Sequence, residues 1–347
     1  MKGRRKMEKI RIVCYGVGAV GSRIAKLLLE KEGLQIVGAI DNAKEKVGKD
    51  LGDVLEIGRK LGVLVSDNVE NVMSKACCSV VVHATGSYLK DVYEQIAPLA
   101  KYGVNVISTC EELSYPYLSE PELAKKLDAL GIKYGMTFLG TGINPGFLMD
   151  TLVITLTGVC QEIDKIKVER VMNAATRRVP FQKKIGAGLS ISEFKEKITN
   201  RKITGHVGLE QSIAMVAAAL RWELDKIRVD PVEPVIAKRE VKSEVIKVKK
   251  GAVAGLRQTA RGIMKRKDVI TLDFQAYIGA EEEYDSITID GTPPIHQKIS
   301  PCVHGDFATV AVVVNSIPRI MNARPGLVTM KDLPILSAAV EDMRKYL

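Results

Sequence analysis

The segment from Ile12 to Arg23 constrains the fold more than any other part of this 347-residue chain. It reads as a short β-branched strand, the glycine pattern Gly16-x-Gly18-x-x-Gly21, and the start of a helix. In such a pattern the first glycine makes the tight turn, and the second lets a pyrophosphate approach the backbone. The third lets the helix pack closely on the strand. The segment therefore predicts a dinucleotide-binding strand–turn–helix unit.

The residues after the glycines support this prediction. A helix is expected over Ala19–Glu30, and its first residues, Ala19 and Val20, would present unpaired N–H groups and the positive end of the helix dipole to the phosphates. A second strand, Leu34–Ile40, ends in Asp41, twenty residues past the last glycine. An acidic residue at this place accepts hydrogen bonds from the adenosine ribose.

The choice between NAD and NADP stays open at this stage. The carboxylate of Asp41 would repel a 2′-phosphate and so favours NAD. Lys44, Lys46 and Lys49 follow it directly and could attract that phosphate, or could belong to a solvated loop. The sequence is compatible with either cofactor.

Strand and helix patterns alternate through the first third of the chain, which predicts an α/β fold with a doubly wound parallel sheet. Ser79–Ala84 is a nearly continuous apolar run, as expected of a buried parallel strand. It leads into Thr85 and Gly86 at the carboxyl edge of the sheet, where ligands collect, so both are candidate cofactor contacts. The last strand of this sheet is expected near Ile132–Met136.

A second domain of α+β type, with a mostly antiparallel sheet, is expected after the loop at Asn144. We predict a Rossmann domain over 8–145, a substrate-binding and dimerisation domain over 146–304, and a C-terminal segment over 305–347 whose helix, Asp306–Met321, returns to the first domain. The strands expected in the second domain are Ile163–Ala174, Ile227–Lys250, Val269–Ile278 and Tyr284–Asp290.

The composition limits the class of protein further. The formal net charge is +10, but lysines and arginines are spread along the chain without interleaved aromatics, so we expect no nucleic-acid partner. The apolar runs are too short to span a membrane. No Cys-x-x-Cys pair occurs among the six cysteines, and the four histidines are scattered, so we expect no metal and no disulfide framework. Reduced cysteines suit a cytoplasmic protein, and the second sheet suggests a homodimer.

Two adjacent glutamates, Glu111 and Glu112, follow the strand Asn105–Ser108. Catalytic groups gather at the carboxyl ends of parallel strands, and a carboxylate beside a nicotinamide can orient an amine or activate water. Adjacent side chains point to different sides, so only one of the two is expected to face a ligand. The alternative is that both belong to a solvated loop.

Four further residues are candidates for contact with the cofactor or with a small substrate that bears a carboxylate. Alternation on Ile163–Ala174 places Arg170 on the apolar face, where a guanidinium needs an anionic partner, either a protein carboxylate or a substrate carboxylate. Asn173 lies close by. His206 precedes an apolar helix and could bind an anion there, but a loop histidine with no catalytic role fits the local sequence equally well. Asn144 lies in an Asn-Pro-Gly loop that is either a plain turn or a loop facing the cofactor, and its position after the last strand of the sheet favours the second.

Several segments resemble the 2,4-diaminopentanoate dehydrogenases, a family of dihydrodipicolinate-reductase-like oxidoreductases related to native amine dehydrogenases and active in anaerobic ornithine breakdown. They are Ile107–Leu113, Gly142–Phe147, Gly205–Glu210 and Lys46–Gly52. The resemblance covers most of the chain, from Ile10 to about Pro334. The His-His-x-x-Lys segment of true dihydrodipicolinate reductases is absent.

The resemblance implies NAD(P)-dependent oxidative deamination of 2,4-diaminopentanoate to 2-amino-4-oxopentanoate and ammonia. It maps the catalytic glutamate of the family onto Glu111. It also implies a small-molecule amino acid substrate, with Asn144, Arg170, Asn173 and His206 lining the substrate pocket. Two other functions remain as alternatives: an imine reductase of the dihydrodipicolinate-reductase type, and a dinucleotide sensor without catalysis.

Overall fold

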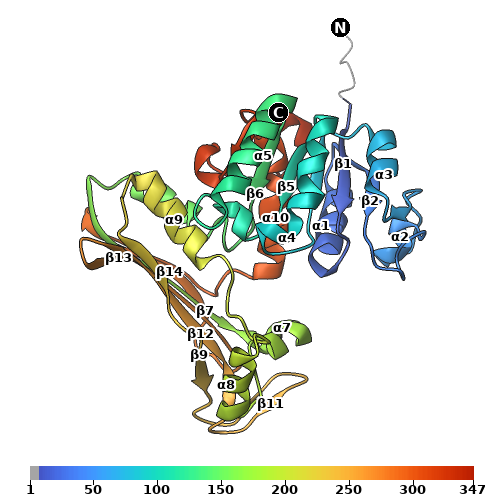
Figure 1. The fold of residues 1–347 in the computed structure, drawn as a ribbon. Coiled ribbons are helices and arrows are strands. Elements are labelled where there is room, and N and C mark those ends of the chain that lie inside the picture. Colours follow the sequence, from blue (N-terminus) through green and yellow to red (C-terminus); the bar gives the residue numbers. More distant parts are fainter. Residues whose placement is uncertain (1–7) are drawn as a thin grey trace. The chain divides into compact units, whose positions relative to one another are not determined.

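The computed structural model describes residues 8–347, which divide into two units (Figure 1). Unit 1 holds the chain up to Phe147 together with Gly305–Leu347, and unit 2 holds Leu148–His304. No helix among residues 8–347 is both long and apolar enough to cross a membrane.

Unit 1 is built on a seven-stranded parallel sheet with the strand order β16-β6-β5-β4-β1-β2-β3. Strand β1 lies between β4 and β2, which is the point where a doubly wound sheet reverses direction and where ligands bind. The predicted α/β fold class is confirmed. The elements of this unit are β1 Ile10–Tyr15, α1 Ala19–Glu30, β2 Leu34–Ile40, α2 Leu51–Val54, β3 Val65–Ser66, α3 Val69–Ala76, β4 Val80–His83, α4 Leu89–Ile96, β5 Asn105–Ser108, α5 Pro121–Tyr134, β6 Thr137–Gly140, α10 Gly305–Asn315, α11 Ile317–Met321 and β16 Gly326–Val328.

The strand predicted over Ile132–Met136 was placed too early. Helix α5 continues through Tyr134 and ends at Gly135, whose φ of +65° is the left-handed conformation that commonly closes a helix. Ile132 lies on the outer face of this helix and is 59% exposed, so its apolar side chain misled the prediction. Strand β6 begins only at Thr137.

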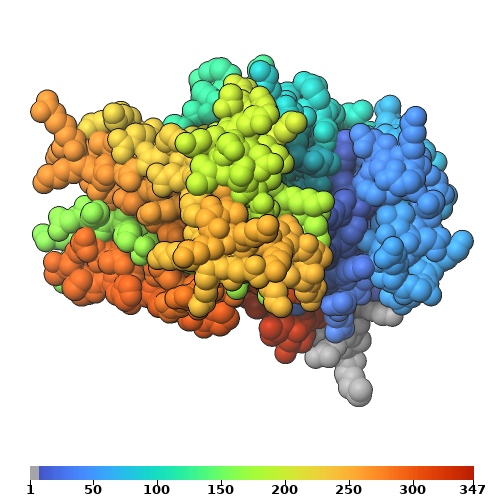
Figure 2. All heavy atoms as spheres, turned by 90° about the horizontal axis from the view of Figure 1, so that it is seen from below, coloured from blue at the N-terminus to red at the C-terminus, as the bar shows by residue number. Residues whose placement is uncertain are grey.

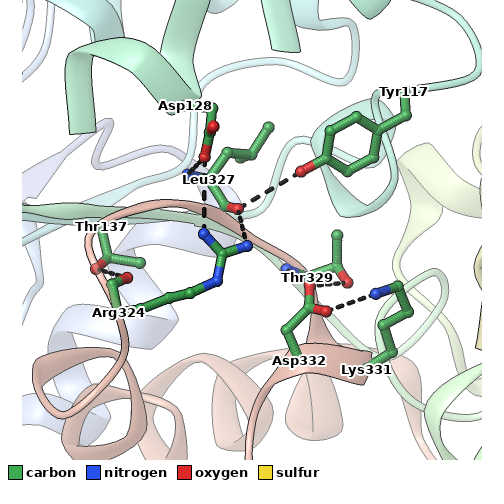
Figure 3. Close-up of polar contacts among 8 residues, drawn as sticks. All are labelled: Tyr117, Asp128, Thr137, Arg324, Leu327, Thr329, Lys331 and Asp332. Carbon is green, nitrogen blue, oxygen red and sulfur yellow. Dashed lines mark hydrogen bonds and ion pairs between the residues drawn. The ribbon is translucent and has the colours of Figure 1, made fainter. Parts of the chain in front are cut away.

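The C-terminal segment supplies the edge strand β16, which Figure 3 shows in detail. The backbone N–H of Leu327 donates to Oδ1 of Asp128 on α5 at 2.9 Å, and the Tyr117 hydroxyl donates to the carbonyl of Leu327 at 3.5 Å. A Cβ atom on Gly131 would lie 2.6 Å from the Cα of Gly326. Helix α5 therefore packs directly on the backbone of β16, at positions that only glycine can occupy.

Unit 2 contains a seven-stranded mixed sheet in the order β15-β14-β7-β13-β12-β8, with β9 also paired to β12. The β7–β13 pair is parallel and the other pairs are antiparallel, which agrees with a mostly antiparallel sheet. Helix α9 packs on β12, β8 and β13. The elements are α6 Thr151–Thr157, β7 Glu162–Asn173, α7 Val179–Lys184, α8 Ile191–Thr199, α9 Leu209–Leu220, β8 Lys226–Val229, β9 Glu233–Ile236, β10 Val241–Lys242, β11 Lys247–Val248, β12 Val253–Met264, β13 Lys267–Tyr277, β14 Tyr284–Thr292 and β15 Ile295–Ile299.

The long strand predicted over Ile227–Lys250 is four short strands in the structure, β8 to β11. Pro231 and Pro234 lie in this stretch, and proline cannot donate a ladder hydrogen bond. Beyond it, the sequence analysis missed β12, one of the two longest strands of the unit. The β10–β11 hairpin lies beside α8 in both views (Figures 1 and 2). Just before α8, the backbone N–H of Gly188 donates to the carbonyl oxygen of Val253, the first residue of β12, at 2.9 Å.

Candidate functional site

The three glycines of the loop after β1 differ in what surrounds them. Gly16 has a φ of +89°, and a Cβ there would lie 2.5 Å from the carbonyl oxygen of Ala84. A Cβ on Gly21 would lie 1.8 Å from the carbonyl oxygen of Gly16. A Cβ on Gly18 would meet no atom within 4 Å. Two of the glycines are therefore required by the fold, whereas Gly18 leaves open space beside the backbone.

Helix α1 begins at this open space. Gly18 is its N-cap and no side chain caps the helix, nor does its first turn carry an acidic residue. The N–H groups of the first turn, including those of Ala19 and Val20, have no intrahelical acceptor and lie at the positive end of the helix dipole. The structure thus fits a pyrophosphate group at this place.

A cavity of about 470 Å³ lies over the carboxyl ends of the strands of unit 1. Among the residues predicted to bind the cofactor, Gly16, Gly18, Asp41 and Thr85 line it. The predicted contacts Ala19, Val20, Gly21 and Gly86 are not among its lining residues. The lining residues that sequence reasoning missed are Tyr15, Ile40, Asn42, Asp67, Ala84 and Gln95. Four of these six are direct neighbours of a predicted residue, whereas Asp67 directly follows β3 and Gln95 lies on α4.

The carboxylate of Asp41 is held in a fixed position at the end of β2. Its Oδ2 accepts from the N–H of Val17 at 2.9 Å, its Oδ1 accepts from the N–H of Ala43 at 2.9 Å, and Lys46 Nζ lies 3.1 Å from Oδ2. Burial alone would raise the pKa of Asp41, but these backbone hydrogen bonds and Lys46 outweigh it and lower the pKa below its usual value. Asp41 is therefore an anion in the cavity wall, and Lys46 is already paired with it.

A buried polar network connects the ends of β4 and β5. Nδ1 of His83 lies 2.8 Å from Oγ of Ser108, and its Nε2 lies 3.0 Å from Oε1 of Gln95 and 2.8 Å from Oγ1 of Thr85. Burial lowers the pKa of His83 to about 4, and the hydrogen bond to Gln95 opposes that shift only in part. The imidazole is therefore neutral at physiological pH and fixes the loop that carries Thr85.

This network makes the stability of unit 1 depend on pH. Since the pKa of His83 is about 4 in the folded chain and about 6.5 in an unfolded one, the unfolded state binds an extra proton between these values. The free energy of unfolding should therefore fall by about 3 kcal/mol as pH drops from 7 to 4. Urea denaturation of the wild type and His83→Gln measures this. The difference in the free energy of unfolding between the two proteins should shrink toward pH 4. If the two free energies instead change in parallel with pH, His83 is not the group responsible.

The two adjacent glutamates have different surroundings. Oε2 of Glu112 accepts a hydrogen bond from the backbone N–H of Leu89 at 2.7 Å, at the N-terminus of α4, and Glu112 is only 9% exposed. Its own N–H donates to the carbonyl of Ser87 at 3.1 Å. Glu111 is half-buried one position earlier. The carboxylate of Glu112 is thus engaged in holding two loops together, which leaves Glu111 as the candidate for chemistry.

The loop that contains Asn144 follows β6, the neighbour of β5 in the sheet. The N–H of Thr141 donates to the carbonyl of Ser108 at 2.9 Å, and a Cβ on Gly146 would lie 2.4 Å from the backbone nitrogen of Gly142. This close approach folds the loop back on itself at the carboxyl edge of the sheet. Asn144 is half-buried in this loop. One strand, β5, separates β6 from β4, which leads into Thr85.

In unit 2, Arg170 lies on the buried face of β7, as alternation predicted, and is 2% exposed. Its Nη1 donates to Oδ1 of Asp285 at 2.6 Å, and its Nη2 donates to the carbonyl of Val303 at 2.5 Å. Of the two partners that the sequence left open, the structure shows the protein carboxylate. Burial raises the pKa of Asp285, and Arg170 opposes that rise.

Removing either member of this pair should destabilise the protein strongly. Arg170→Met leaves the Asp285 carboxylate buried without its cation, and such changes cost about 3–5 kcal/mol. The double variant with Asp285→Leu should recover much of that loss, because no buried charge remains. Urea denaturation gives both values. The exposed Lys125→Met, which breaks the Lys125–Glu122 pair, is the control and should leave the free energy of unfolding close to that of the wild type.

The other two predicted residues of unit 2 are Asn173, at the end of β7, and His206, in the loop before α9. The His206 ring stacks on Phe274, with ring centroids 4.5 Å apart and planes 7° from parallel, and Phe274 is the register partner of Arg170. The N–H of His206 donates to Gln258 at 2.8 Å. Oδ1 of Asn173 accepts from the N–H groups of Ala175 and Gly279 at 3.1 and 3.2 Å. Unit 2 therefore brings His206 next to the strand that carries Arg170, while their contact with a substrate stays a prediction.

Two family models match the chain. The model for the N-terminus of dihydrodipicolinate reductase matches residues 10–111, and that for the 2,4-diaminopentanoate dehydrogenase C-terminal domain matches residues 147–347. The 2,4-diaminopentanoate dehydrogenase of Acetoanaerobium sticklandii is 36% identical over 344 residues, which is 97% of each chain. The chain belongs to the 2,4-diaminopentanoate dehydrogenase family. The resemblance found in the sequence is confirmed.

Two amine dehydrogenases are also similar to this member of the family. That of Streptomyces virginiae is 24% identical and covers 95% of this chain and 97% of its own. The solved structure of an amine dehydrogenase from Mycobacterium smegmatis has a TM-score of 0.82 at 32% identity, covering 96% of this chain and 98% of that one. The protein is therefore an NAD(P)-dependent oxidoreductase, and its relatives support amine dehydrogenase activity.

No group of three or more His, Cys, Asp or Glu side chains within residues 8–347 is placed to hold a metal ion.

Proposed function

We propose that this protein catalyses oxidative deamination of the amine on the fourth carbon of 2,4-diaminopentanoate, giving 2-amino-4-oxopentanoate and ammonia. The similarity to the Acetoanaerobium sticklandii enzyme, over 97% of each chain, supports this substrate. The observation that carries the proposal is the placement of Glu111 after β5, in a chain whose neighbouring Glu112 is engaged with α4.

The bound dinucleotide supplies the hydride acceptor. The C4–H bond of the substrate breaks as hydride leaves, and the nitrogen lone pair forms the C=N bond of an iminium. Glu111 first accepts a hydrogen bond from the neutral amine and so orients it. It then takes a proton from water as the oxygen adds to the iminium carbon, and returns a proton to nitrogen as ammonia departs. In sum, the amine, the oxidised cofactor and water give ketone, ammonia, reduced cofactor and one proton.

We propose NAD as the preferred cofactor. The cavity wall carries two carboxylates, Asp41 and Asp67, and the pKa of Asp41 is lowered so that it stays ionised. Lys46, which could have attracted a 2′-phosphate, already pairs with Asp41. A third phosphate would therefore meet like charge in this part of the cavity, whereas ribose hydroxyls would find an acceptor.

The test is an assay in both directions with a panel of substrates. The purified protein should reduce NAD with 2,4-diaminopentanoate faster than with simple amines or α-amino acids. In the reverse direction, NADH oxidation with 2-amino-4-oxopentanoate should require ammonia. Reduction of a cyclic imine without ammonia would favour the imine reductase instead, and binding without any turnover would favour a sensor.

We also propose that the protein acts as a homodimer on a free amino acid. Helix α9 packs on one face of the unit 2 sheet. On its other face, Lys167, Thr271 and Thr288 lie in register on neighbouring strands, which supports a polar contact with a second copy. Light scattering coupled to size-exclusion chromatography should give a mass near twice 38.0 kDa.

A further inference from the structure

Asp67 contributes the second carboxylate in the wall of the dinucleotide cavity. It follows β3, whose Ser66 is the register partner of Ile40 on β2. The N–H of Asp41 donates to the carbonyl of Ser66 at 3.1 Å, so Asp41 and Asp67 occupy corresponding places after neighbouring strands. Both line the 470 Å³ cavity.

The two carboxylates differ in their surroundings. Asp41 accepts two backbone hydrogen bonds and pairs with Lys46. The carboxylate of Asp67 is exposed and has neither a hydrogen bond nor an ion pair within the described chain. The polar side chains on either side of Asp67 already accept hydrogen bonds. Ser66 Oγ accepts from the N–H of Asn68 at 3.1 Å, and Oδ1 of Asn68 accepts from the N–H of Asn71 in the first turn of α3 at 2.9 Å. Asp67 is thus a carboxylate of this wall that has no protein partner among the described residues.

The order of the groups in a dinucleotide indicates what reaches Asp67. The pyrophosphate fits at the open space of Gly18, and the adenosine ribose fits at Asp41. The purine is attached to the far side of that ribose and extends along the sheet toward β3. A carboxylate can only accept hydrogen bonds, and the exocyclic N6 amine is the donor on the edge of adenine.

We propose that Asp67 accepts a hydrogen bond from the N6 amine of the cofactor's adenine and selects adenine over a 6-oxo purine. The inference deepens the proposed function, because it rests on the dinucleotide cavity that this function requires. It does not depend on which amine is oxidised. It predicts that the base end of the cofactor is recognised by a specific acceptor rather than by apolar contact alone.

The experiment compares NADH with its hypoxanthine analogue, in which a carbonyl oxygen replaces the N6 amine. Dissociation constants are measured by calorimetric titration, without substrate. The wild type should bind the analogue about tenfold or more weakly, because a charged acceptor then faces an acceptor. Asp67→Ala should bind both ligands with similar, weakened affinity. Asp67→Asn should bind the analogue better than the wild type does, because its amide can donate to the 6-oxo group.

The matched control is Asp91→Asn, an exposed aspartate of α4 that does not line the cavity. It should keep the wild-type preference for NADH. Equal binding of both ligands by the wild type, as would follow if Asp67 met N1–H of the analogue or a ribose hydroxyl, would overturn the inference. A preference that survives in Asp67→Ala would overturn it too.

The outcomes separate this inference from the proposed function. If the wild type discriminates between the two ligands and Asp67→Ala does not, while no amine is turned over, Asp67 reads the base and the proposed reaction is wrong. If amines are oxidised but both ligands bind equally, the reaction stands and the role of Asp67 is wrong. If neither ligand binds to the folded protein, both proposals fail.

Discussion

Glu111→Gln should lower turnover of the amine substrate by about 10²–10⁴-fold and leave the dissociation constant of NADH close to that of the wild type. The amide keeps the shape of the side chain but cannot take a proton from water at neutral pH. Glu111 follows β5 and is absent from the lining of the dinucleotide cavity, so cofactor affinity has no reason to change. Steady-state kinetics and calorimetric titration with NADH measure the two effects separately.

Glu112→Gln is the matched control, since it makes the same chemical change one residue away. Its carboxylate accepts from the N–H of Leu89 at the positive end of α4. Loss of the charge should lower the free energy of unfolding by about 1 kcal/mol and leave turnover within a few-fold of wild type. Equal loss of turnover in both variants, or an active Glu111→Gln, would remove Glu111 from the catalytic role.

The parts of the fold that the sequence predicted well are those set by local patterns. Helix α1 and strands β2 and β5 have the predicted bounds, because apolar periodicity and glycine punctuation define them within about a dozen residues. The turn at the glycines between β1 and α1 was predicted from the same local signals. Its three glycines have distinct surroundings, and Gly18 is the one with open space beside it.

The parts that could not be predicted depend on partners distant in sequence. The distinction between Glu111 and Glu112 rests on Leu89, 23 residues from Glu112. The ion pair of Arg170 rests on Asp285, 115 residues away. Periodicity can place a charged side chain on a buried face, but it cannot say which group meets it. The two carboxylates of the cavity show the same limit of prediction from sequence. Asp41 was predicted from its spacing to the glycines, whereas no spacing rule points to Asp67.

Strand β12 was missed for another reason. Its middle carries the consecutive polar residues Arg257, Gln258 and Thr259, and two glycines interrupt the rest, so no continuous apolar run marks the strand. It is nevertheless largely buried, because β13 lies on one side, β8 and β9 lie on the other, and α9 covers it. Gly255 and Gly262 look like strand breakers in the sequence, but a Cβ at Gly255 would lie 2.1 Å from the carbonyl of Ala276. Close approach of two strands requires glycine there.

Two alanine substitutions in the glycine loop should have opposite effects, and together they test where the dinucleotide lies. Gly21→Ala places a Cβ 1.8 Å from the carbonyl oxygen of Gly16. Because that oxygen belongs to the backbone, no side-chain movement can relieve the clash. We expect a loss of about 3 kcal/mol or more in the free energy of unfolding, or failure to fold. Gly18→Ala adds a Cβ that meets no atom within 4 Å, at a φ of −76° that alanine adopts readily.

Gly18→Ala should therefore fold with a stability within about 1 kcal/mol of the wild type, the small loss reflecting its N-cap position. Its methyl group would occupy the space that a pyrophosphate needs beside the backbone, so the dissociation constant of NADH should rise by about tenfold or more. Thermal denaturation measures the change in stability, and calorimetric titration of the same samples measures the change in the dissociation constant of NADH. A Gly18→Ala protein that binds NADH as tightly as the wild type would show that the phosphates do not pass this glycine. The cavity of unit 1 would then hold its ligand in a different orientation, and the placement of the adenine beside Asp67 would fail with it.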